Sequence, residues 1–124
     1  MAKIYSETLA EPWFSAIRDK KKIAEGRLDK SWVKGLQPMD LIHFTRVTPE
    51  EEPPPEVLPT IVVRVIAVKR YKKFTDLFDE VGLDKVLPGK KSYDDGVDVY
   101  RKWYSEEKEK ELGVVGIFVE VIRE

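Results

Sequence analysis

The sequence contains no cysteine and only one histidine. The absence of cysteine excludes disulfide frameworks, thiolate zinc sites, iron–sulfur clusters and thiol nucleophiles. A single histidine excludes a metal site built from several imidazoles. We therefore expect no metal and no cofactor, and any chemistry must use Lys, Ser, Thr, Asp, Glu, Arg or Tyr side chains.

Long apolar runs are also missing, and the formal net charge is only -1. No segment approaches the ~18 to 20 apolar residues that a membrane-spanning helix needs, so we expect a soluble, cytoplasmic protein with no membrane partner. The 22 Lys and Arg residues nearly balance the 23 Asp and Glu residues, which argues against a uniformly basic nucleic-acid binder. The charges are nevertheless segregated, with basic stretches at 20–27 and 61–73 and acidic ones at 49–60 and 105–111.

What is present is enough chain for one domain. At 124 residues the chain can bury a core of its own, and we assign residues 1–124 to a single domain and favour a monomer. The charged fraction of 36%, rich in Lys and Glu, is typical of thermophilic proteins.

Hydrophobic patterning predicts several strands interrupted by short helices. Apolar residues alternate with polar ones in the expected strands, recur at helical spacing in the expected helices, and leave a proline-rich acidic loop over 48–59. The expected strands are 23–28, 41–47, 60–68 and 114–122, and the expected helices are 11–18, 74–81 and one or two within 94–112. Strands and helices do not alternate regularly, so the pattern predicts an α+β fold, a small mixed β-barrel with short helices packed around it.

The densest group of chemically useful residues lies at the start of the first expected strand. Three lysines, Lys20, Lys21 and Lys22, precede Glu25, Gly26 and Arg27. In a strand Glu25 and Arg27 share one face, and Gly26 permits a close approach by another backbone segment or a flat ligand. The alternative is a surface strand with a local ion pair of little energetic consequence.

These residues, together with others along nearly the whole chain, resemble the ASCH domain family of PUA-like barrels. The opening segment resembles the first helix, the "GxKxxEGR"-type motif and the "GDxIxF"-type strand of that family. The later half of the sequence also resembles the family, at Tyr71, Phe74 to Phe78, Leu87-Pro88-Gly89, Tyr100-Arg101-Lys102-Trp103-Tyr104 and Gly113 to Ile117. Two positions depart from the family pattern, because Lys20 and Met39 stand where many members have glycine.

The resemblance implies a cleft beside the first helix that holds RNA or a nucleotide-like ligand. Arg27 and the lysines would contact phosphate, and Glu25 would accept from a base amino group or orient Arg27. A second basic run pairs charges with an aromatic ring in the way that single strands are bound, although such a run at a strand exit is also typical of a solvated edge. The candidate ligand-binding residues are Lys20, Lys21, Lys22, Glu25, Arg27, Lys69, Arg70, Tyr71, Lys72 and Lys73.

Two alternatives remain at this stage. Some members of the wider family hydrolyse the acetyl group of N4-acetylcytidine with a Lys, a Thr and a Glu. Lys22 matches the Lys, but Glu25 stands in place of the Thr. The acidic residue of the set would have to be Asp94 or Asp95. The same site would serve a metal-independent ribonuclease with Lys22 and Glu25 as catalytic residues. A neighbouring carboxylate raises the pKa of an ammonium group, the opposite of what a basic or nucleophilic lysine needs. The sequence therefore favours a binding domain over either enzyme. The other alternative is a protein-interaction module.

The three tryptophans are expected to belong mainly to the core. Large aromatic side chains in a chain of this length are usually buried, so we expect at most one of Trp13, Trp32 and Trp103 at a ligand cleft.

Overall fold

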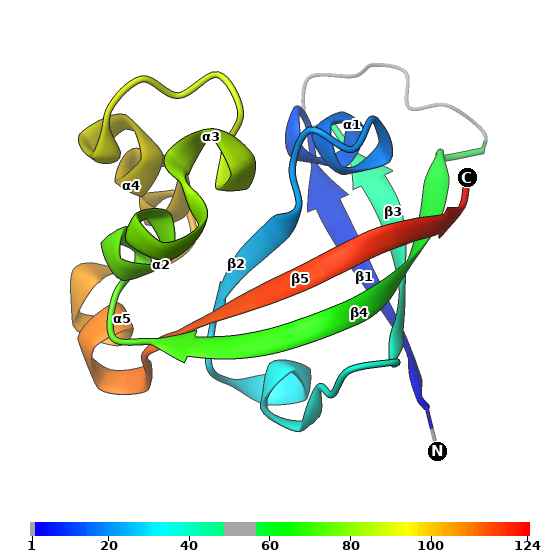
Figure 1. Ribbon diagram of the computed structural model, residues 1–124, viewed down its shortest axis with the longest axis horizontal. Coiled ribbons are helices and arrows are strands. Elements are labelled where there is room, and N and C mark those ends of the chain that lie inside the picture. Colours follow the sequence, from blue (N-terminus) through cyan, green and yellow to red (C-terminus); the bar gives the residue numbers. More distant parts are fainter. Residues whose placement is uncertain (1, 49–56) are drawn as a thin grey trace.

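The computed structural model describes residues 2–48 and 57–124, which form one strongly curved mixed sheet with helices beside it (Figure 1). Within these residues the sheet has five strands in the order β1-β3-β4-β5-β2. The strands are β1 (Ile4–Ala10), β2 (Ala24–Leu28), β3 (Leu41–Val47), β4 (Thr60–Tyr71) and β5 (Val114–Arg123). The helices are α1 (Trp13–Arg18), the 3-10 helix η1 (Ser31–Gly35), α2 (Phe74–Val81), α3 (Leu83–Val86), α4 (Tyr93–Arg101) and α5 (Glu106–Leu112).

The sheet curls into a half-barrel whose two edge strands, β1 and β2, come near each other. β1 pairs with β3 in parallel, whereas the β3–β4, β4–β5 and β5–β2 pairs are antiparallel. The long β4 and β5 strands cross the molecule as a pair, with register shifts that increase the curvature (Figure 1). The α+β half-barrel confirms the predicted fold class.

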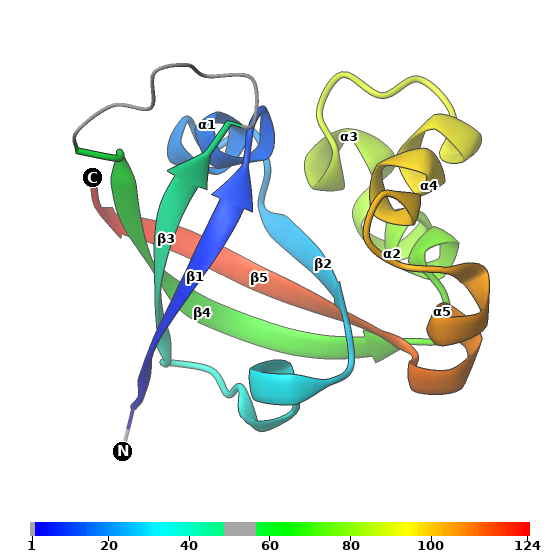
Figure 2. The ribbon, with the colours of Figure 1, turned by 180° about the vertical axis from the view of Figure 1, so that it is seen from behind.

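Helices α2 to α5 lie together on the side of the half-barrel next to β2, and α1 lies over one end of the sheet (Figure 2). Leu77 of α2 packs on the paired glycines Gly26 and Gly116, where an added Cβ atom would lie 3.1 and 2.8 Å from its methyl groups. Glu109 of α5 is buried, although it lies in the acidic stretch 105–111. Its carboxylate accepts from the Phe74 amide and from Arg101, both at 2.6 Å, so it connects α5 to α2 and α4.

The structure also corrects several element boundaries. β3 and α2 match the predicted residues, but β4 extends to Tyr71, so part of the expected basic tail is strand. β1 was not predicted at all. Within the expected loop 48–59, residues 49–56 lie outside the described part of the chain. None of the helices in that part is long and apolar enough to cross a membrane.

Candidate functional site

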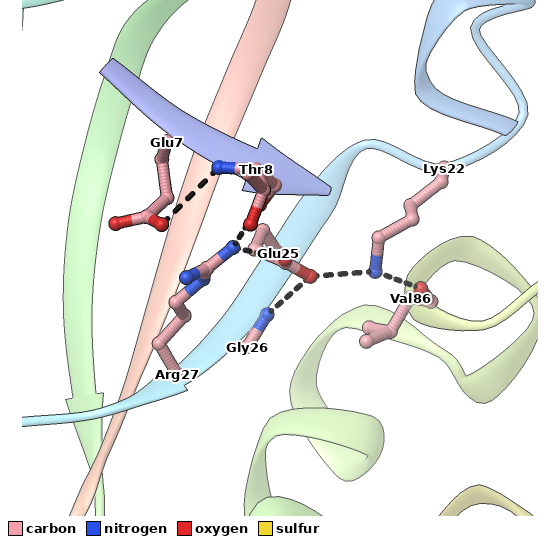
Figure 3. Close-up of polar contacts among 7 residues, drawn as sticks. All are labelled: Glu7, Thr8, Lys22, Glu25, Gly26, Arg27 and Val86. Carbon is pink, nitrogen blue, oxygen red and sulfur yellow. Dashed lines mark hydrogen bonds and ion pairs between the residues drawn. The ribbon is translucent and has the colours of Figure 1, made fainter. Parts of the chain in front are cut away.

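Lys22 is buried at the boundary between the sheet and the helices. Its ammonium group donates to the main-chain carbonyl of Val86 at 2.5 Å and lies 3.3 Å from Oε1 of Glu25 (Figure 3). Its side chain has 0% exposure, and the Trp13 ring centroid lies 5.7 Å from Nζ. Lys22 therefore lies inside the protein, and a phosphate outside cannot contact it in this conformation.

Glu25 is the centre of the polar cluster because both of its carboxylate oxygens are engaged. Oε1 faces Lys22 and also accepts from the Gly26 amide at 3.2 Å, while Oε2 accepts from Arg27 at 3.3 Å (Figure 3). The same Arg27 nitrogen donates to the Thr8 carbonyl on β1 at 3.2 Å. β1 and β2, the two edge strands of the half-barrel, do not pair with each other. The Arg27 guanidinium group therefore connects them through a side-chain hydrogen bond.

A cavity of about 260 Å³ lies against this cluster, between the edges of β1 and β2 and helix α4. Its polar surface includes Glu25 and Arg27. Its aromatic surface consists of Trp13, Tyr100, Trp103 and Tyr104, of which Trp103 is 56% exposed and the others are buried or half-buried. A charged floor with aromatic walls is suited to a planar, polar ligand.

Tyr100 places a hydroxyl group directly above the β2 backbone. Its ring stacks on Phe74 with centroids 3.9 Å apart, and a Cβ atom at position 26 would lie 2.8 Å from its oxygen. Gly26 is therefore required by the close approach of the Tyr100 and Leu77 side chains, whereas the sequence predicted the approach of another backbone or a flat ligand.

The comparisons with known proteins agree with this geometry. The profile of the ASCH domain matches residues 8–123. The chain belongs to the ASCH domain family. Two solved structures are similar over almost the whole chain: the hypothetical protein PH0355 (34% identity, TM-score 0.81, 96% of this chain and 99% of that one) and protein PF0455 from Pyrococcus furiosus (36% identity, TM-score 0.74, 96% and 97%).

A more distant likeness concerns the fold alone. A tyrosine-to-phenylalanine mutant of the protein ZmASCH from Zymomonas mobilis shares 13% identity with a TM-score of 0.56, and the match covers 97% of this chain and 73% of that one. No curated protein matches the chain.

Two departures from the ASCH motif have a conformational meaning. Lys20 and Met39 stand where many members of the family have glycine, and their φ values are 63° and 80°. Side chains other than glycine are disfavoured in this left-handed region. Glycine adopts this region readily, whereas here the non-glycine residues Lys20 and Met39 occupy it.

The other predicted binding residues do not line the cavity. Lys20 and Lys21 are exposed beyond α1, and Lys72 and Lys73 are exposed after β4. Lys69 and Arg70 form surface ion pairs with Glu80 at 2.6 Å and with Asp29 at 3.1 Å, and the Tyr71 ring packs beside Gly116. The structure brings Glu25 and Arg27 together at the cavity, with Lys22 behind them. Asp94 and Asp95 are exposed in the first turn of α4 and do not line the cavity.

Sequence reasoning missed most of the aromatic wall. Tyr100 and Tyr104 were part of the family resemblance but received no ligand role, Trp103 was considered only as one of three tryptophans, and Thr8 was not considered. At most one tryptophan was expected at a ligand cleft, and two, Trp13 and Trp103, line this cavity. Within residues 2–48 and 57–124 no group of three or more His, Asp or Glu side chains is placed to ligate a metal.

Burial lowers the pKa of Lys22 below its ordinary value of 10.5, and this effect outweighs the opposing effect of the Glu25 carboxylate. The expectation that the carboxylate would dominate this pKa is therefore wrong. The folded chain holds the Lys22 proton less tightly than the unfolded chain does. Burying the protonated lysine therefore lowers the free energy of unfolding. This loss is largest below the pKa of the folded state, and it decreases as the pH rises from that pKa toward 10.5.

We therefore expect wild type to gain stability relative to Lys22→Met as the pH is raised from neutrality toward 10.5. Titrating groups remote from Lys22 are shared by the two proteins and cancel in the difference, and above neutral pH the acidic groups are largely ionised in both. Urea denaturation of wild type and Lys22→Met at a series of pH values measures the difference in their free energies of unfolding. A difference that stays constant, or that falls with rising pH, would show that burial does not control the protonation of Lys22.

Proposed function

We propose that this ASCH domain binds RNA or a nucleotide-like ligand, with one base in the cavity between β1, β2 and α4. The observation that carries the proposal is the combination, in one cavity, of the Glu25–Arg27 ion pair and four aromatic side chains. Bases of single strands are commonly held by stacking on aromatic rings and on arginine, with hydrogen bonds to their polar edges.

The two residues best placed to meet such a ligand are Arg27 and Trp103. The guanidinium of Arg27 is held in place by Glu25 and by the Thr8 carbonyl, and its side chain remains 18% exposed. Trp103 exposes more than half of its surface at the cavity wall. A rigid, partly accessible cation beside an accessible indole provides both a charge for phosphate and a surface for a base.

The test is binding of a short fluorescent single-stranded RNA by wild type, Arg27→Ala and Arg64→Ala. Arg64 is the matched control, since it is an arginine on β4 that pairs with Glu120 at 2.7 Å and does not line the cavity. We expect affinity that falls steeply with salt, a several-fold loss in Arg27→Ala and little change in Arg64→Ala. Equal affinities of wild type and Arg27→Ala would contradict the assignment of the cavity. If the RNA and free nucleotides all failed to bind, the proposed function would be wrong.

A hydrolase using Lys22 is the second candidate, and one observation favours it. The lowered pKa of Lys22 is what a basic or nucleophilic lysine requires. The position of the ammonium group argues against the hydrolase. The Val86 carbonyl and Glu25 enclose this group, and Lys22 itself does not line the cavity, whereas Glu25 does. Incubation with N4-acetylcytidine or RNA, followed by chromatography, distinguishes the two functions: the enzyme requires turnover that disappears in Lys22→Ala.

A further inference from the structure

Lys30 places a positive charge beside the wall of the cavity. It stands between β2 and η1 in the chain, in the region where β2 lies next to α5 (Figure 2). Its Nζ atom lies over the ring of Tyr104, 5.9 Å from the ring centroid. Tyr104 is half-buried and lines the cavity, whereas Lys30 itself does not. The Lys30 ammonium group therefore lies at the rim of the cavity.

The Lys30 side chain is exposed, and both its main chain and its ammonium group are held in place. The Lys30 amide donates to the Leu28 carbonyl at 2.9 Å, and the Lys30 carbonyl accepts from the Val33 amide at 3.3 Å. A cation within about 6 Å of a ring centroid is attracted by the negative face of the ring. The contact with Tyr104 thus directs a flexible surface lysine to the rim of the cavity.

Lys30 is also accessible and unpaired. In the described part of the chain, two lysines lie over rings that line the cavity, Lys22 over Trp13 and Lys30 over Tyr104. Lys22 is enclosed and paired with a carboxylate. Lys30 is exposed, and its ammonium group makes no ion pair or hydrogen bond with any residue of that part. Its charge is therefore available to a ligand.

A second cation acts on the same ring. Burial raises the pKa of Tyr104, while the positive charge of Arg27 lowers it and two carboxylates raise it further. Asp29, the acid next to Lys30 in sequence, is paired with Arg70 at 3.1 Å, so its charge is offset. Arg27 is already engaged in an ion pair. Lys30 is the cation at this rim that no carboxylate of the described residues pairs.

A base that fills the cavity leaves its phosphate outside. The cavity volume of about 260 Å³ is below the roughly 300 to 1,000 Å³ of sites that enclose drug-sized molecules. One base therefore occupies it, and the ribose and phosphate of the same nucleotide have to lie at the rim.

We propose that Lys30 forms a phosphate subsite at the rim of the cavity: the base occupies the cavity, and the phosphate attached through the ribose contacts the Lys30 ammonium group. This inference rests on the proposed function and specifies its ligand as a nucleotide or a strand, in preference to a nucleoside. An ammonium group is a compact point charge that binds phosphate. The same contact serves the terminal phosphate of a free nucleotide and a phosphodiester group of RNA.

The experiment measures, by calorimetry, the binding of the four ribonucleosides and of their 5′- and 3′-monophosphates to wild type, Lys30→Met and Lys34→Met. Methionine keeps an apolar side chain over Tyr104 and removes the charge. Lys34 is the matched control, because it is an exposed lysine of η1 that contacts no ring among the described residues.

We expect wild type to bind at least one monophosphate about 3- to 10-fold more tightly than its nucleoside, an effect between that of an exposed ion pair and that of a charge-assisted hydrogen bond. Lys30→Met should lose this gain and bind the nucleoside as wild type does. Lys34→Met should keep the gain. With a short single-stranded RNA, the slope of log affinity against log salt concentration should be smaller by about one in Lys30→Met.

Three results would contradict these expectations. A gain from the phosphate that persists in Lys30→Met, or that wild type does not show, would overturn the inference and leave the proposed function standing. Equal losses in Lys30→Met and Lys34→Met would also overturn it, because the effect would then be one of general surface charge. Failure of wild type to bind nucleosides, nucleotides and RNA alike would instead overturn the proposed function itself.

Discussion

Replacement of Glu25 by alanine is expected to lower the free energy of unfolding by about 3 to 5 kcal/mol. The substitution leaves the ammonium group of Lys22 inside the protein without its countercharge, which lies 3.3 Å away in the wild type. The Lys22 side chain has 0% exposure in the wild type, so its ammonium group depends on Glu25 and on the Val86 carbonyl for stabilisation. Guanidinium chloride denaturation of wild type and variant measures the difference.

A matched control is Glu80→Ala, because Glu80 also pairs with a lysine, Lys69, but at the surface, where both side chains are about half exposed. This variant should unfold as the wild type does. The double variant Lys22→Met, Glu25→Leu should recover much of the stability lost in Glu25→Ala, since it removes both buried charges. Equal stabilities of Glu25→Ala and Glu80→Ala would show that the buried cluster is not organised around Glu25.

Replacement of Trp103 by alanine is expected to weaken nucleotide binding by about 1 to 3 kcal/mol, or about 5- to 150-fold, if a base stacks on its ring. The side chain is 56% exposed, so the free energy of unfolding should change little. Fluorescence anisotropy of a labelled single-stranded RNA measures the affinity without depending on the indole signal.

The conservative variant Trp103→Phe separates stacking from other effects. It keeps an aromatic ring at the cavity wall and should retain most of the affinity. If Trp103→Ala bound as tightly as wild type, or if Trp103→Phe lost as much affinity as Trp103→Ala, stacking on this ring would not contribute to binding.

The part of the site that local sequence predicts is the Glu25-Gly26-Arg27 segment. Alternation in a strand places Glu25 and Arg27 on one face, and the structure shows their ion pair at 3.3 Å. The glycine between them indicates a close approach, but the groups that approach are the Tyr100 and Leu77 side chains and not the backbone or flat ligand expected from the sequence. These inferences need only neighbouring residues, and for that reason they could be made without a structure.

Lys22 illustrates what local sequence cannot show. It belongs to a run of three lysines, and in sequence it is indistinguishable from Lys20 and Lys21, which are exposed. Its burial depends on the Val86 carbonyl, 64 residues farther along the chain. The hypothesis that the three lysines meet phosphate together assumed one common environment, whereas the turn at Lys20 separates them.

The remaining omissions have the same origin. β1 is an edge strand in which only Leu9 is fully buried, so its apolar pattern is weak, and its pairing with β3 joins distant segments. The spacing of Tyr100, Trp103 and Tyr104 predicts one apolar helix face, and it cannot distinguish a face against the core from a face along an open sheet edge. The docking of α4 near β1 and β2 decides that these aromatic residues line a cavity.

The central claim, that the ligand binds between β1, β2 and α4, is tested most directly by an NMR titration of the isotope-labelled protein with ribonucleoside monophosphates. The account predicts saturable shifts of the Gly26 and Arg27 amides and of the Trp103 indole N–H, with the amides of Lys72 and Lys73 unchanged. Shifts confined to Lys72, Lys73 and the end of β4 would place binding at the basic surface instead and contradict the account.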